Sequence, residues 1–194
     1  GVFVQLPLPS HLDTDQIVSA IDPSKDVDRF HPENIKKLQE SADYSEDLIL
    51  PPVFRVVSAV LEHINWDLPG KSACIMANAD IFKENLAHFL QKKGFTPITT
   101  SIDDPEIVRK TSRADLLITA VGESNVVNKK MVKEGATVID VGITRDEEGR
   151  IKGDVDSEDI SSQASYLTPV PGGVGPMTVA ATLENVLRLY KNKR

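Results

Sequence analysis

The feature that most constrains the fold is a regular alternation of short apolar segments with helix-like segments in the second half of the chain. Four segments are rich in apolar and β-branched residues, as central strands are, and they cover 73–76, 96–99, 115–121 and 136–141. Helix-like stretches of a length suited to crossovers lie between or beside them, at 81–93, 105–112 and 128–133. This alternation predicts an α/β fold with a doubly wound parallel sheet that is covered on both faces.

The segments around this sheet predict part of a second α/β domain. Residues 2–6 have the character of a buried strand, so the chain is expected to begin inside a domain. A helix capped by Asp13 is expected over 13–21, and Gly175 with Pro176 opens a final, strongly apolar helix that should pack against both domains or a second subunit. The predicted organisation is a partial catalytic domain at 1–52, a linking helix at 53–69, a Rossmann-like domain at 70–167, and a returning loop and helix at 168–194.

Charge and composition exclude several classes of protein. Lys and Arg number 22 against 29 Asp and Glu, giving a net charge of −7, and no basic block exceeds the last four residues. An extended nucleic-acid surface is therefore not expected, because such binding needs clustered cations. The apolar runs are far shorter than the roughly 20 residues of a membrane span. We expect no nucleic-acid or membrane partner, and a cytoplasmic location with an organellar one left open.

Neither the cysteine nor the histidines indicate a metal site. Cys74 is the one cysteine, and it stands in an apolar run that is typical of a small buried side chain. The four histidines lack metal-ligand spacing. We therefore expect no metal.

Three elements could carry chemistry. Gln5 precedes two prolines, which should end the strand and present its amide at the edge of a sheet. Asp26 and Asp28 would face the same side of an extended segment, where two carboxylates can accept hydrogen bonds from an amino-substituted heterocycle or act on a proton. The loop 168–178 holds three Gly and three Pro before a helix, which permits close approach of a ligand to the backbone. Each element also has a purely structural alternative. Gln5 could simply hydrogen-bond nearby backbone, the two aspartates could be solvated residues of a turn, and the loop 168–178 could be a stiff structural turn.

Five blocks of sequence carry a resemblance to a known family. They are GVFVQLPLP at 1–9, KDVDRFHP at 25–32, VIDVGITR at 138–145, GDVD at 153–156 and TPVPGGVGPMT at 168–178. Together they resemble the bifunctional methylenetetrahydrofolate dehydrogenase/methenyltetrahydrofolate cyclohydrolase family. The resemblance implies an enzyme that oxidises 5,10-methylenetetrahydrofolate with NADP or NAD and hydrolyses the methenyl product to 10-formyltetrahydrofolate. It also implies tetrahydrofolate derivatives as ligands and a homodimer.

The resemblance also implies roles for individual residues. Gln5 supports the catalytic lysine, and Asp28 holds the pterin, so both are expected in the catalytic site. Substrate also contacts Pro171, Gly172 and Gly173, whose backbone lies along the folate. The residues expected on the cofactor side are Ala77, Asn78, Ala79, Gly122, Gly142 and Ile143.

Two departures from the family pattern concern the folate side. The family's Tyr-x-x-x-Lys helix, which supplies the lysine, precedes the QLPLP strand and is not among these 194 residues. The chain by itself is therefore expected to be inactive. Arg29 stands where the family has Gly, and a left-handed backbone at that position would cost about 1 kcal/mol. Its cation could also pair with Asp28 and take the carboxylate that the pterin needs.

The largest departure concerns the dinucleotide. The family's loop reads G-R-S-x-x-V-G-x-P, whereas residues 77–85 here read ANADIFKEN, with both glycines replaced. Asp80 and Glu84 bring negative charge to a helix that should receive pyrophosphate, and the second strand ends without an Arg for a 2′-phosphate. We therefore expect weak NADP binding. The alternative reading is a catalytically impaired homologue that serves as a binding or dimerisation module.

Overall fold

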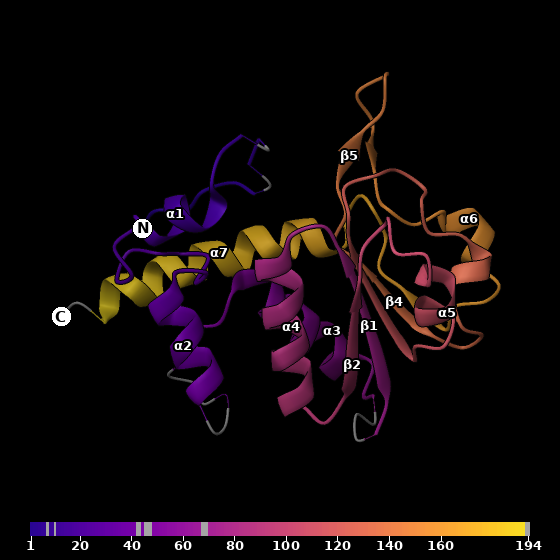
Figure 1. Cartoon of the computed structure of the whole chain (residues 1–194), viewed down its shortest axis with the longest axis horizontal. Helices are drawn as coiled ribbons and strands as arrows, with labels where there is room; N and C mark the ends of the chain where they lie inside the picture. The colour runs from indigo at the N-terminus through magenta and orange to yellow at the C-terminus, as the bar shows by residue number, and fades with distance from the viewer. Residues whose placement is uncertain (7, 10, 42–43, 45–47, 67–69, 193–194) are drawn as a thin grey trace. The chain divides into compact units, whose positions relative to one another are not determined.

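The computed structural model (Figure 1) describes all residues except 7, 10, 42–43, 45–47, 67–69 and 193–194. The chain divides into two compact units. The first comprises residues 1–64 and 177–194, and the second comprises residues 65–176. The observed divisions thus fall after residues 64 and 176, whereas the predicted boundaries fall after residues 52, 69 and 167.

The second unit contains the expected parallel sheet. Its strand order is β2-β1-β3-β4-β7, and every neighbouring pair is parallel. The strands are β1 (Ser72–Ala77), β2 (Thr96–Thr100), β3 (Leu116–Ala120), β4 (Thr137–Asp140) and β7 (Tyr166–Leu167). The first four lie within one residue of their predicted bounds, so the α/β fold is confirmed. The two-residue β7 escaped prediction because it is too short for an apolar pattern to reveal.

Helices connect these strands, and their side chains fill the core. The connecting elements are α4 (Asp80–Lys92), α5 (Ile107–Thr111), the 3-10 turn η1 (Lys129–Met131) and α6 (Ser157–Ile160). The helix expected over 128–133 is only that single turn, because Val132 adopts an extended conformation and ends it. Cys74 is fully buried as predicted, and burial raises the pKa of its thiol to about 12. The cysteine is therefore a core residue rather than a nucleophile.

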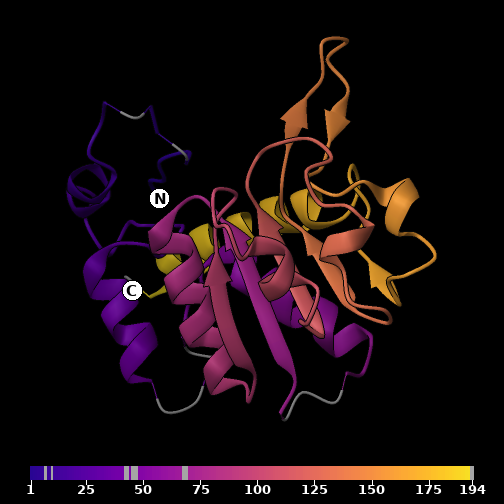
Figure 2. The same cartoon turned by 45° about the vertical axis from the view of Figure 1, so that its right-hand side comes forward.

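A β-hairpin projects from the second unit beyond its sheet. It consists of β5 (Thr144–Arg145) and β6 (Ile151–Lys152), which pair antiparallel, and Figure 2 shows it standing clear of the other strands. The turn is tied by Asp146, whose carboxylate accepts from the Arg150 N–H and side chain, each at 2.8 Å.

The first unit is built mainly from helices. They are α1 (Thr14–Ser19), α2 (Pro32–Glu40), α3 (Pro52–His63) and most of α7 (Val174–Lys191). Asp13 caps α1 as predicted, accepting from the Gln16 N–H at 3.0 Å. The unpredicted α2 begins with Pro32 at its first position and a cap from His31, whose Nδ1 accepts from the Glu33 N–H.

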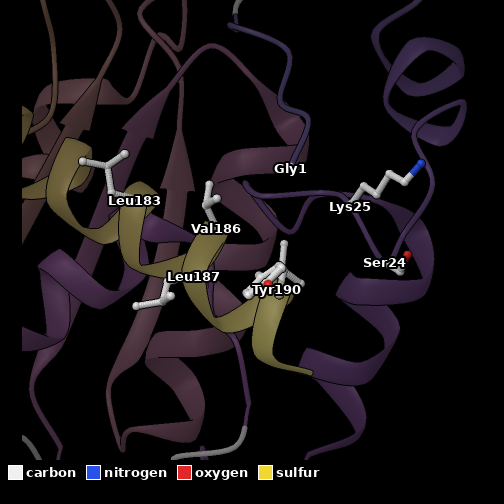
Figure 3. A pocket seen from close by; sticks show the side chains of 8 residues that line it. Gly1, Ser24, Lys25, Leu183, Val186, Leu187 and Tyr190 are labelled. Atoms are coloured by element: carbon white, nitrogen blue, oxygen red, sulfur yellow. The ribbon is translucent and has the colours of Figure 1, made fainter. Parts of the chain in front are cut away.

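One expectation for the first unit was wrong. The opening strand does not form, because among the described residues Val2 finds one bridge partner, Asp26, and a strand needs a ladder. On α7, Val179, Leu183 and Tyr190 remain more than half exposed in the single chain, so packing of this helix against a second subunit stays a prediction. Figure 3 shows side chains of α7 beside Gly1 and Lys25 in a hollow within this unit. None of the described helices is long and apolar enough to cross a membrane.

Candidate functional site

The carboxyl ends of three parallel strands place all six predicted cofactor residues at one edge of the sheet. Residues 77–79 end β1 and lead into α4, Gly122 follows β3, and Gly142 with Ile143 follows β4. Ala77 lies opposite Ala120 in the β1–β3 register. Because β2 and β3 flank β1 on opposite sides, this edge is the switch point of the sheet, where open α/β folds bind ligands.

Two buried carboxylates organise the loops after β3 and β4. Asp154 accepts three successive backbone N–H groups, from Val121 at 2.7 Å, Gly122 at 2.8 Å and Glu123 at 3.1 Å. Three such donors in a row form a nest that would otherwise attract an anion. The N–H groups of the nest after β3 are therefore occupied by a side chain of the protein itself and are not available to an anion.

Asp140 forms the other half of this network. Its Oδ1 accepts from the Gly142 N–H at 2.9 Å, and its Oδ2 accepts from the Val155 N–H at 3.0 Å. Burial raises the pKa of Asp140, and the nearby charge of Asp154 adds to that rise while backbone hydrogen bonds oppose it. A Cβ on Gly142 would lie 2.0 Å from the Asp154 Oδ1, so this glycine is required by close approach. Asp154 lies in the GDVD block, but its role as an acceptor for the backbone N–H groups after β3 was not predicted from the sequence.

The end of β1 offers backbone groups to an anion. Ala79 is the N-cap of α4 and supplies no side-chain cap, so the first N–H groups of this thirteen-residue helix are directed at the sheet edge. Asp80 pairs with the Lys83 ammonium at 2.6 Å, so the repulsion expected from Asp80 is largely balanced. Asn78 donates to the Val121 carbonyl at 3.0 Å and joins the ends of β1 and β3.

The residues at this edge fit a dinucleotide in part. The uncapped start of α4 and the small side chain of Ala79 suit a pyrophosphate that contacts backbone, whereas the side chain of Ala77 is fully buried. Carboxylates crowd the end of β2, where Asp104 accepts from the Thr100 hydroxyl at 2.9 Å. The start of α4 therefore suits the pyrophosphate of a dinucleotide, but the end of β2 does not suit an additional phosphate group.

Asp26 and Asp28 in the first unit differ sharply, although the sequence suggested a matched pair. Asp26 is 1% exposed and accepts from the Arg29 N–H at 3.0 Å, the His31 N–H at 2.9 Å and the Asn34 amide at 2.8 Å. Asp28 is half-buried, and no described residue donates a hydrogen bond to it. Burial and the charge of Asp26 raise the pKa of Asp28 to about 6. Asp26 thus shapes the loop, and Asp28 keeps its lone pairs available.

Arg29 has the strained backbone expected of it but not the expected partner. Its φ is +65°, in the left-handed region. The guanidinium donates to the carbonyls of Pro23 at 3.1 Å and Asp26 at 3.5 Å. Among the described residues it forms no ion pair with Asp28, because its buried side chain turns toward these carbonyls. The expectation that Arg29 takes the Asp28 carboxylate is therefore not met.

Gln5 belongs to the same unit and lies on its surface. It is exposed, and its amide donates to the adjacent Leu6 carbonyl at 3.2 Å. This local contact leaves the amide available, but it does not test the role that the resemblance implies.

The Gly/Pro loop of the second unit is compact and partly exposed. The Val170–Pro171 peptide is cis, and Gly172 has φ +103°. A Cβ on Gly173 would lie 2.3 Å from the Pro169 carbonyl oxygen, so the loop folds tightly onto itself. Pro171 and Gly172 are exposed and can be approached by a ligand. Among the described residues, no group of three or more His, Cys, Asp or Glu is placed to hold a metal.

Comparisons with known proteins agree with this architecture. Residues 51–194 match the model of a family described as tetrahydrofolate dehydrogenase/cyclohydrolase, NAD(P)-binding domain. The bifunctional protein FolD of Nautilia profundicola is 43% identical over 192 residues, covering 99% of this chain and 66% of the relative. FolD of Hydrogenobaculum sp. is 46% identical over 193 residues, covering 100% and 68%. The chain thus spans about two thirds of the length of these relatives.

Solved structures give the same result. A FolD methylenetetrahydrofolate dehydrogenase/cyclohydrolase from Campylobacter jejuni superposes with a TM-score of 0.85 at 44% identity, over 98% of this chain and 66% of that one. The Trypanosoma brucei enzyme, complexed with NADP cofactor and an inhibitor, has a TM-score of 0.85 at 32% identity, over 97% and 66%.

Proposed function

The chain belongs to the tetrahydrofolate dehydrogenase/cyclohydrolase family, and on this basis we propose that the protein acts in one-carbon folate metabolism. It oxidises 5,10-methylenetetrahydrofolate to the methenyl form and hydrolyses that product to 10-formyltetrahydrofolate. The observation that carries this proposal is the assembly of residues 77–79, Gly122, Gly142 and Ile143 at the switch point of the sheet. The relatives' names support the chemistry.

Asp28 binds the pterin in this proposal. A pterin presents an N–H and an amino group side by side, and a carboxylate can accept from both. The half-buried Asp28 carboxylate has no donor among the described residues, so binding satisfies it without breaking an existing contact. Its pKa of about 6 leaves it mostly ionised at neutral pH. Asp28 thus positions the folate.

The two reactions make different demands on the protein. In the oxidation, the N-terminus of α4 and the loops after β3 and β4 would hold NADP or NAD, which would supply the hydride acceptor. In the hydrolysis, water adds to the methenyl carbon, one carbon–nitrogen bond breaks, and a proton is released. The Gln5 amide supports the lysine of the family's Tyr-x-x-x-Lys helix. The protein acts as a homodimer, which sedimentation of the complete protein tests.

The test follows both reactions in the complete protein. Loss of methenyl absorbance reports hydrolysis, and gain of reduced-nucleotide absorbance reports oxidation. We expect Asp28→Asn to raise the KM for folate in both assays by about 30-fold, the scale of one charged hydrogen-bond pair. Asp156→Asn is the matched control, because Asn caps α6 as well as Asp does and both activities should persist. Wild-type protein without either activity, or unchanged kinetics in Asp28→Asn, would contradict the proposal.

A further inference from the structure

The end of β2 carries a compact charged cluster beside the proposed dinucleotide site. Thr100 lies opposite Met76 in the β1–β2 register, one residue before the end of β1. The Asp104 carboxylate accepts from the Thr100 hydroxyl at 2.9 Å, the Lys110 ammonium at 2.6 Å and the Glu106 N–H at 2.8 Å. These contacts hold Asp104 at the same edge as residues 77–79. Its side chain is 17% exposed, so it remains reachable.

Negative charge exceeds positive charge around this cluster. Glu84 of α4 accepts from the Thr99 hydroxyl, and Asp103 and Glu106 flank Asp104 in the chain. The two cations of α5 are already paired, Lys110 with Asp104 at 2.6 Å and Arg109 with Glu106 at 2.7 Å. The hydrogen bond from Lys110 is the main cause that lowers the pKa of Asp104 to about 2, so the carboxylate stays charged at any physiological pH. Neither cation of α5 is therefore free to pair with a further anion placed here.

The two nicotinamide dinucleotides differ at the adenosine ribose, which binds beside the second strand of such sheets. NAD has a 2′-hydroxyl there, which can donate to a carboxylate, whereas NADP has a 2′-phosphate, which requires a cation. The Asp104 Oδ1 accepts from the Glu106 N–H and has a further lone pair to offer.

We propose that Asp104 is a specificity-determining residue of the dinucleotide site and that it selects NAD over NADP. Its carboxylate accepts a hydrogen bond from the ribose 2′-hydroxyl and repels a 2′-phosphate. This inference rests on the proposed function, since it assumes that a dinucleotide occupies the switch-point edge. It goes beyond that function by naming the nucleotide and the residue that chooses it.

Titration calorimetry of the complete protein with NAD and with NADP tests the inference without any turnover. We expect NAD to bind the wild type about tenfold more tightly than NADP, the ratio that about 1.4 kcal/mol produces. Asp104→Asn removes the repelling charge and leaves Lys110 unpaired, so the NADP:NAD affinity ratio should rise about tenfold. Lys110→Met should move the ratio the other way, because it removes the cation and keeps the carboxylate.

Asp103→Asn is the matched control. It removes the same charge from an exposed neighbour, whereas the Thr100 hydroxyl donates to Asp104, so the ratio should change less than about threefold. A wild type that binds NADP as tightly as NAD overturns the inference and leaves the proposed function intact. An equal shift in Asp103→Asn and Asp104→Asn overturns the role of Asp104. Failure of both nucleotides to bind overturns the inference together with the proposed function.

Discussion

The loops after β3 and β4 and the loop at residues 26–34 both depend on paired aspartates, but they use them differently. In the second unit, Asp140 and Asp154 are both saturated by backbone N–H groups. In the first unit, Asp26 is saturated in the same way, whereas Asp28 receives no hydrogen bond from any described residue. Asp26, Asp140 and Asp154 are all fully buried, whereas Asp28 is half-buried. Asp28 thus differs from the other three both in its exposure and in the number of donors that the chain provides to it.

The largest effect is expected where a glycine makes room for this network. Gly142→Ala would place a Cβ 2.0 Å from the Asp154 Oδ1, which forces the carboxylate off its three N–H donors. We expect unfolding free energy to fall by about 3 kcal/mol, as overpacking with loss of buried hydrogen bonds does. Urea denaturation measures it. Gly122→Ala is the control: its Cβ meets nothing within 4 Å, and only its left-handed backbone costs about 1 kcal/mol. Equal losses in the two variants would disprove the close-approach argument.

Asp154→Asn keeps the shape of the side chain but turns one acceptor into a donor. The N–H groups of Val121, Gly122 and Glu123 then lose part of their shared partner. We expect a loss of about 2 kcal/mol in urea denaturation, together with faster hydrogen exchange at these amides. Asp156→Asn, two residues away at the start of α6, should change stability by less than about 0.5 kcal/mol. A stable Asp154→Asn protein with protected amides would show that the network is dispensable.

The sequence predicted the sheet far better than the networks at its edge. Strands β1 and β3 are mostly apolar and buried, and β2 and β4 are rich in β-branched residues, so their positions follow from local pattern. The Asp154 network joins residues more than thirty positions apart, and no local pattern reports such a contact. The opening strand was predicted from composition, but a strand also needs a partner, which the sequence does not display. Arg29 illustrates both cases: its backbone strain was predicted, and the direction of its side chain was not.

Asp26 and Asp28 in the first unit are predicted to respond differently to the same substitution. Asp26→Asn leaves the N–H groups of Arg29 and His31 and the Asn34 amide with a weakened acceptor. We expect it to lose about 1.5 kcal/mol of unfolding free energy. Asp28→Asn removes a charge whose burial is unfavourable and breaks no contact with a described residue, so no loss is expected. Thermal denaturation of both variants at pH 7 compares them, and greater damage from Asp28→Asn would reverse the assignment of the two carboxylates.

The smallest effect concerns pH, and it isolates Asp28 as the binding carboxylate. Burial and the charge of Asp26 raise the pKa of Asp28 to about 6. In the proposed function the pterin donates its hydrogen bonds to the ionised form of Asp28, so its affinity should be nearly full at pH 7 and decline as the pH falls through 6. At pH 5, one unit below this pKa, about a tenth of the carboxylate is ionised, and affinity should be about tenfold lower. Calorimetric titration of the complete protein with a tetrahydrofolate analogue measures this decline. In Asp28→Asn the affinity should already be low at pH 7 and should change little down to pH 5. If that variant keeps the wild-type pH profile, another group is responsible for the titration, and the unpaired Asp28 does not hold the pterin.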